Sequence, residues 1–156
     1  MNFYRELGFL IFGSRLRRLS EYFLSEINGV YAQEGIGFDA SWFPVFYLLS
    51  KGKAVAIQEL AETMIVSHSA ASQLVGVLKA RGLVKAARSL HDGRKQLIEL
   101  TPNGDALLQR LIPVWEAINK TMEAKADHRL LEELAVAEDS LLQNPLAADV
   151  LKTLHA

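Results

Sequence analysis

The chain has 156 residues, a formal net charge of −1 and no cysteine, which favours one domain and excludes disulfides, thiol catalysis and thiolate metal sites. Its longest run without a charged residue, 63–78, contains Ser, His and Gln, which excludes a transmembrane span. The apolar stretch 8–12 is too short for a signal peptide, so we expect a cytoplasmic protein that contacts no membrane.

The first thirty residues predict an amphipathic helix, because apolar side chains recur at spacings of three and four. These side chains are Leu16, Leu19, Phe23, Ile27 and Val30. Gly35 and Gly37 then break the pattern. A second helix is expected over 41–50, with Ser41 as its N-cap and Pro44 in its first turn. Because this segment is apolar on nearly all sides, we expect it to be buried.

Two short helices with a tight connection follow. Residues 57–64 carry apolar side chains at i, i+3, i+4 and i+7. The next helix begins after Ser67, a favourable N-cap, and Gly82 suits the position just beyond its C-terminus. Its buried stripe is expected to contain Ala71, Leu74, Val75 and Leu78.

A hairpin and three more helices complete the chain. Two strand-like runs, 83–90 and 95–101, flank Asp92-Gly93, and Asp-Gly is a strong hairpin signal. Thr101-Pro102 starts a long helix in which Pro113 should produce a kink. Further helices are expected over 128–142 and after Asn144-Pro145. The sequence therefore predicts a mainly α fold with a small β-hairpin wing.

The order of two short helices and a hairpin is typical of a winged helix-turn-helix, here about 53–104. The second helix has an outward face that is polar, small at its N-terminal end and almost free of acids, as a helix in a major groove requires. We assign DNA-binding roles on this helix to Ser67, His68, Ser69, Ser72, Gln73 and Lys79. Gly76 on the same face is either a weak point of the helix or a position of close approach to DNA.

Positive charge is concentrated in the same region. Residues 67–95 contain six basic residues and one acidic residue, a net charge of +5. A local positive field favours an anionic partner, although a solvated charged face would give the same count. On the hairpin, basic side chains would contact phosphates or a minor groove, and Asp92 would orient Arg94. The residues assigned there are Arg88, Asp92, Arg94 and Lys95.

Taken together, four segments resemble the MarR (multiple antibiotic resistance regulator) family of winged helix-turn-helix transcriptional regulators. The segments are Ser67-His68-Ser69-Ala70-Ala71-Ser72-Gln73-Leu74-Val75, Leu78-Lys79-Ala80-Arg81-Gly82-Leu83-Val84, Asp92-Gly93-Arg94 and Leu100-Thr101-Pro102-Asn103-Gly104. The resemblance implies a homodimer that reads a near-palindromic operator in double-stranded DNA. Its dimerisation helices would be about 3–32 and 105–155. It also implies the wing roles of Asp92 and Arg94.

The stretch 42–46 looks like a variant that precedes an acetyltransferase domain in some fusion proteins of this family. Because the chain ends at Ala156, we expect no such catalytic domain and no enzymatic activity. No two of the four histidines have helical i, i+4 spacing, so we expect no metal and no other cofactor. Ser89, His91 and Asp92 resemble a catalytic triad in residue type, but an exposed hairpin tip offers no oxyanion hole.

Five aromatic residues could line a pocket for a small aromatic or anionic effector, although aromatic residues at helical spacing also form ordinary cores. They are Phe23, Trp42, Phe46, Tyr47 and Trp115. The sequence as a whole predicts a single domain over 1–156 that acts as a homodimeric transcriptional regulator, most often a repressor. Two alternatives stay open: a winged helix used as a protein-interaction module, and a regulatory subunit of an acetyltransferase.

Overall fold

The computed structural model describes residues 3–87, 97–143 and 145–156. The chain divides into two compact units, Met1–Leu111 and Ile112–Ala156. Within the described ranges, no helix combines the length and the apolar character needed to cross a bilayer.

The first unit begins with a broken N-terminal helix. α1 (Phe3–Glu6) is followed by the 3-10 turn η1 (Gly8–Ile11) and then by the long helix α2 (Phe12–Gln33). The prediction of one uninterrupted helix is therefore wrong before residue 12, because Gly8 adopts a left-handed backbone with φ +53°. The predicted apolar stripe does lie on α2, yet Tyr31 is the one buried residue of this helix.

An aromatic cluster forms the centre of the first unit. The Phe38 ring packs edge-to-face against the rings of Tyr31, Trp42 and Phe46, at centroid distances of 5.2, 5.5 and 5.0 Å. Trp42 ends the short 3-10 helix η2 (Ala40–Trp42), and Phe46 lies on α3 (Phe43–Leu49). The cluster therefore joins the end of α2 to α3.

The segment predicted as one helix over 41–50 differs from expectation in two ways. Its N-cap is Asp39 rather than Ser41, because the Asp39 carboxylate accepts a hydrogen bond from the Ser41 N–H at 2.8 Å. It is also buried on one face only: Phe43 and Tyr47 are exposed and stack on each other at 5.5 Å. The opposite face, with Val45, Phe46 and Leu49, is buried.

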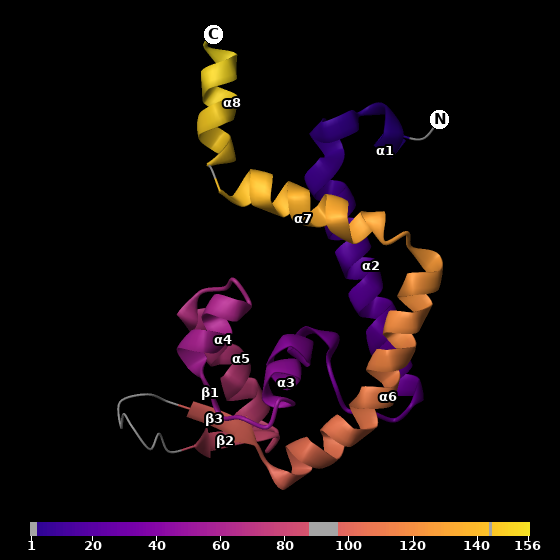
Figure 1. Cartoon of the computed structure of the whole chain (residues 1–156), viewed down its shortest axis with the longest axis vertical. Helices are drawn as coiled ribbons and strands as arrows, with labels where there is room; N and C mark the ends of the chain where they lie inside the picture. The colour runs from indigo at the N-terminus through magenta and orange to yellow at the C-terminus, as the bar shows by residue number, and fades with distance from the viewer. Residues whose placement is uncertain (1–2, 88–96, 144) are drawn as a thin grey trace. The chain divides into compact units, whose positions relative to one another are not determined.

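A three-stranded antiparallel sheet closes the unit. Its strands are β1 (Val55–Ala56), β2 (Val84–Ala87) and β3 (Leu97–Leu100), in the order β1-β3-β2. Two-residue β1 is too short to show alternation in the sequence, so it was not predicted. Two helices complete this part, α4 (Ile57–Thr63) and α5 (His68–Ala80), and both were predicted. Figure 1 shows α3, α4 and α5 grouped beside the sheet.

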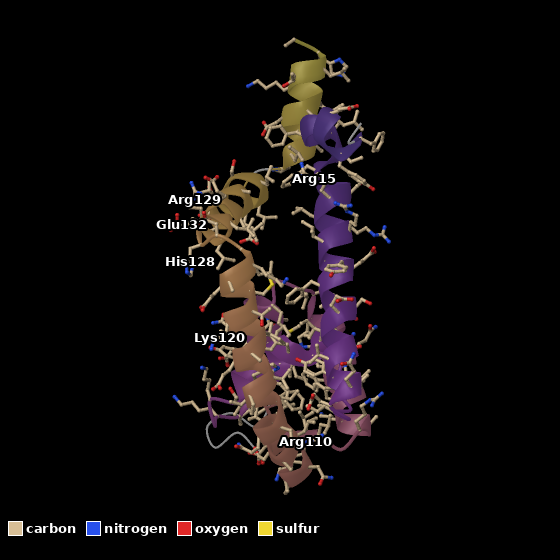
Figure 2. All side chains as sticks on the ribbon, turned by 90° about the vertical axis from the view of Figure 1, so that its right-hand side faces the viewer. Arg15, Arg110, Lys120, His128, Arg129 and Glu132 are labelled. Atoms are coloured by element: carbon tan, nitrogen blue, oxygen red, sulfur yellow. The ribbon has the colours of Figure 1, made fainter. Side chains whose placement is uncertain are left out.

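The helix α6 (Pro102–Lys125) starts in the first unit and continues into the second. Arg110 of α6 anchors the end of α2, because its guanidinium donates to the carbonyl oxygens of Glu34 and Gly35 at 3.0 and 3.2 Å (Figure 2). Pro113 lies inside α6, and the kink expected there stays a prediction.

The second unit contains the predicted C-terminal helices, α7 (Arg129–Leu142) and α8 (Leu146–Leu154). Asp127 lies two residues before α7, and its carboxylate accepts from the Arg129 N–H at 3.0 Å and from the Arg129 guanidinium at 2.6 Å. These hydrogen bonds lower the pKa of Asp127 below its ordinary value. The predicted cap residue Asn144 lies outside the described residues. None of the described residues between 112 and 156 is buried, so this unit has no core of its own.

Candidate nucleic-acid interface

The helix α5 is fixed at its N-terminus by the predicted cap. The Ser67 hydroxyl oxygen accepts a hydrogen bond from the Ala70 N–H at 3.1 Å. This bond satisfies one of the backbone donors that every helix leaves unpaired at its start. The first turn of α5 therefore has a defined beginning, immediately after the turn from α4.

The C-terminus of α5 is fixed as well. The Leu83 N–H donates to the Leu78 carbonyl at 3.0 Å, and the Gly82 N–H donates to the Lys79 carbonyl at 2.9 Å. These are the two bonds of a Schellman motif, and Gly82 supplies the left-handed residue with φ +69°. Together with buried Ala71, Val75 and Leu78, the two ends determine which face of α5 points outward.

The outward face of α5 agrees with the predicted DNA-binding surface in exposure and polarity. Its exposed residues include all the predicted ones: Ser67, His68, Ser69, Ser72, Gln73 and Lys79. The helix contains no acidic residue. Within the described ranges, no hydrogen bond engages the side chains of Ser69, Ser72 or Gln73, so their donors and acceptors are available to a ligand.

The hairpin that follows α5 is described only at its base. β2 pairs with β3 from Val84↔Leu100 to Ala87↔Leu97, and Lys85 forms a cross-strand ion pair with Glu99 at 3.2 Å. The predicted wing residues lie outside the described residues. They are Arg88, Asp92, Arg94 and Lys95.

Thr101 joins α5, β2 and α6 at one point. Its hydroxyl accepts from the Gly104 N–H at 3.0 Å, which confirms the predicted cap of α6, and donates to the Gly82 carbonyl at 2.6 Å. Its own N–H donates to the Leu83 carbonyl at 3.0 Å. No local sequence pattern predicts the link between Thr101 and Gly82, because 19 positions separate the two residues. This junction holds the end of α5 against the start of α6.

Arg81, which sequence reasoning did not select, ties α5 to the aromatic cluster. Its guanidinium lies 4.8 Å from the centre of the Trp42 ring, a cation–π geometry. Trp42 is itself buried. Arg81 therefore helps to set the orientation of α5 against the core. No local sequence pattern predicts this contact, because Arg81 and Trp42 lie far apart in the chain.

The five aromatic residues predicted for an effector pocket fall in three places. Trp42 and Phe46 belong to the buried aromatic cluster. Phe23 and Tyr47 are exposed, and the Lys51 ammonium lies 4.3 Å from the centre of the Tyr47 ring. Trp115 belongs to the second unit. Among the described residues, no group of three His, Asp or Glu side chains is arranged to hold a metal ion.

Residues 36–95, which contain η2, α3, β1, α4, α5 and β2, match the family model described as MarR family. Over this segment, which is 60 of the 156 residues, the chain is similar to the MarR family. It is 26% identical over 109 residues to the HTH-type transcriptional regulator Hpr of Bacillus pumilus. That match covers 69% of this chain but 53% of Hpr, so the chain spans about half the length of this relative.

Two solved structures show the same fold as this chain. The transcriptional regulator BldR of Sulfolobus solfataricus matches with a TM-score of 0.63 and 22% identity, over 92% of this chain and 98% of BldR. S. aureus MepR, solved as a complex with DNA, matches with a TM-score of 0.69 and 15% identity, over 85% of this chain and 96% of MepR. The predicted fold class, mainly α with a small β wing, is confirmed.

Proposed function

We propose that this chain is a transcriptional regulator of the MarR family that binds double-stranded DNA sequence-specifically. The observation that carries the proposal is α5, which is fixed at both ends and presents an acid-free polar face. The sequence that follows contains Arg88, Arg94 and Lys95. Such a helix can enter a major groove and read base edges, while basic side chains on the wing bind phosphates. MepR, which shares the fold, has been solved with DNA.

The residues divide into two roles under this proposal. On α5, Ser67, His68, Ser69, Ser72 and Gln73 lie nearest the bases and the adjoining phosphates, and Lys79 adds positive charge. On the wing, Arg88, Arg94 and Lys95 contact the DNA backbone or the minor groove, with Asp92 orienting Arg94.

The proposed active form is a homodimer on a near-palindromic operator, with one domain over 1–156, a reading head over about 53–104 and dimerisation helices over about 3–32 and 105–155. The lack of buried residues in the described parts of the second unit, 112–143 and 145–156, supports this form, because helices without a core need a partner surface. Large apolar side chains are exposed along α7 and α8. They are Leu130, Leu131, Leu134, Val136, Leu141, Leu142, Leu146, Val150, Leu151 and Leu154.

We further propose that the dimer acts as a cytoplasmic repressor, without enzymatic activity of its own, and that a small aromatic or anionic effector releases it from DNA. The exposed Tyr47 ring with its neighbouring Lys51 ammonium supports this effector class. The effector must bind the DNA-free arrangement more tightly than the DNA-bound one. A 100-fold preference corresponds to about 2.7 kcal/mol.

Selection of bound fragments from random duplex DNA tests the proposal. We expect enrichment of one near-palindromic sequence, bound at least about a thousandfold more tightly than scrambled duplex. A protein-interaction module would enrich no sequence, and a regulatory subunit of an acetyltransferase would co-purify with that enzyme. If no DNA sequence is enriched, with or without co-purification of an acetyltransferase, the result contradicts the proposal.

Replacing Gln73 with alanine is expected to change which operator variants bind best. A glutamine amide can pair with both hydrogen-bonding positions of an adenine edge, so its loss should cost about 1–3 kcal/mol at one base pair and relax specificity there. Because Gln73 is exposed, the melting temperature should hardly change. Titration of wild-type and Q73A protein against single-base operator variants at fixed salt measures the effect.

Lys79→Ala on the same helix is the matched control. It removes a charge rather than a base contact, so it should weaken binding to all variants about equally. If Q73A protein ranks the operator variants as the wild type does, the proposed orientation of α5 in the groove is wrong.

A further inference from the structure

The turn that joins α4 to α5 contains a backbone conformation that its residue type disfavours. Ile65 has φ +54°, in the left-handed region. A β-branched side chain is a steric outlier there, whereas glycine adopts the region freely. The other positive-φ residues in the described ranges are all glycines, at positions 8, 35, 52 and 82.

Three helices end in the same hydrogen-bonded motif, which allows a comparison within the chain. At the end of α4, the N–H groups of Ile65 and Val66 donate back to carbonyls of the helix at 3.2 and 3.0 Å. The equivalent bonds form around Gly35 at the end of α2 and around Gly82 at the end of α5. Ile65 thus occupies the position that the other two helices give to glycine.

Burial within the chain does not compensate for this strain. The Ile65 side chain is 82% exposed and the neighbouring Val66 is 39% exposed. A buried isoleucine stabilises a fold because it removes apolar surface from water, but this one leaves most of its surface in water. Strained, exposed positions of this kind cluster at functional sites.

We infer that Ile65 is a specificity-determining residue that contacts the C5-methyl group of a thymine in the major groove. The inference rests on the proposed DNA-binding function. Ile65 precedes the α5 cap residue Ser67 by two positions, and the N-terminal residues of a recognition helix are those that approach the bases. Apolar side chains recognise thymine through its methyl group, and the turn 64–66 is entirely apolar.

Ile65→Asn in the full chain separates this role from a structural one, because asparagine tolerates the left-handed region. We expect an unchanged or higher melting temperature together with a loss of operator affinity. The loss should be about fourfold for each methyl contact removed, the equivalent of one buried methyl group. Ile65→Val, which keeps the branched apolar side chain, should bind and melt like the wild type.

Replacing each thymine of the selected operator with uracil identifies the contact, since uracil lacks only the methyl group. Wild-type protein should lose affinity at one thymine in each half-site, and I65N protein should be insensitive there. Full affinity of I65N protein, or equal uracil sensitivity in both proteins, would overturn the inference while leaving the proposed function intact. A melting temperature that falls together with affinity would overturn it too. Failure to enrich any operator would overturn both.

Discussion

Replacing Gly104 with alanine is expected to destabilise the fold by at least about 3 kcal/mol. A Cβ at this position would overlap the Leu83 carbonyl oxygen and would lie 3.1 Å from a methyl group of Leu100. The Leu83 carbonyl cannot move cheaply, because it also accepts the Thr101 N–H in the junction between α5 and α6. Thermal and denaturant unfolding of the G104A protein should both show the loss.

Gly76→Ala is the matched control for this prediction. A Cβ at Gly76 meets no other atom within 4 Å, so alanine in this exposed helix interior should stabilise the fold by about 0.5–1 kcal/mol. If the G104A protein has the same melting temperature as the G76A protein, the close packing of Gly104 against the Leu83 carbonyl is wrong.

Replacing Val150 with aspartate is expected to raise the dissociation constant of the dimer more than a hundredfold. This change corresponds to a loss of at least about 2.7 kcal/mol of association free energy. Val150 lies within the exposed apolar residues of α8, which we place in the dimer interface. Burying a carboxylate without a partner there costs several kcal/mol in each subunit. Sedimentation over a range of protein concentrations, combined with circular dichroism, measures both association and folding.

Lys152→Asp on the same helix controls for the added negative charge, because Lys152 lies outside the apolar stripe and is exposed. It should leave the dimer largely intact. A compact, folded monomer of the wild-type chain at nanomolar concentration would contradict the dimer, since the second unit would then be stable without a partner surface.

The parts of the site that could be predicted from sequence are those fixed by neighbouring residues. Ser67 and Thr101 cap helices through backbone groups three positions away, and Gly82 ends α5 through carbonyls three to five positions back. Such signals are visible in a short window of sequence. The start, the end and the outward face of α5 were therefore predicted correctly.

The features that sequence reasoning missed depend on distant partners or on strain. The Arg81–Trp42 contact and the Thr101–Gly82 hydrogen bond join segments far apart in the chain. The break at Gly8 interrupts a pattern that looked continuous, and the left-handed backbone of Ile65 is contrary to the preference of its residue type. Neither long-range contacts nor backbone strain produce a periodic pattern of apolar residues, so sequence periodicity does not predict them.

The salt dependence of operator binding tests the central claim most directly. Each phosphate neutralised by Lys or Arg contributes about −0.9 to the slope of log affinity against log salt concentration. If α5 and the wing of each subunit hold the DNA, the selected operator should be bound by the dimer with a linear slope steeper than about −4. The selected operator should also bind more tightly than scrambled duplex at every salt concentration. A slope near zero, or equal affinity for both duplexes, would contradict the account.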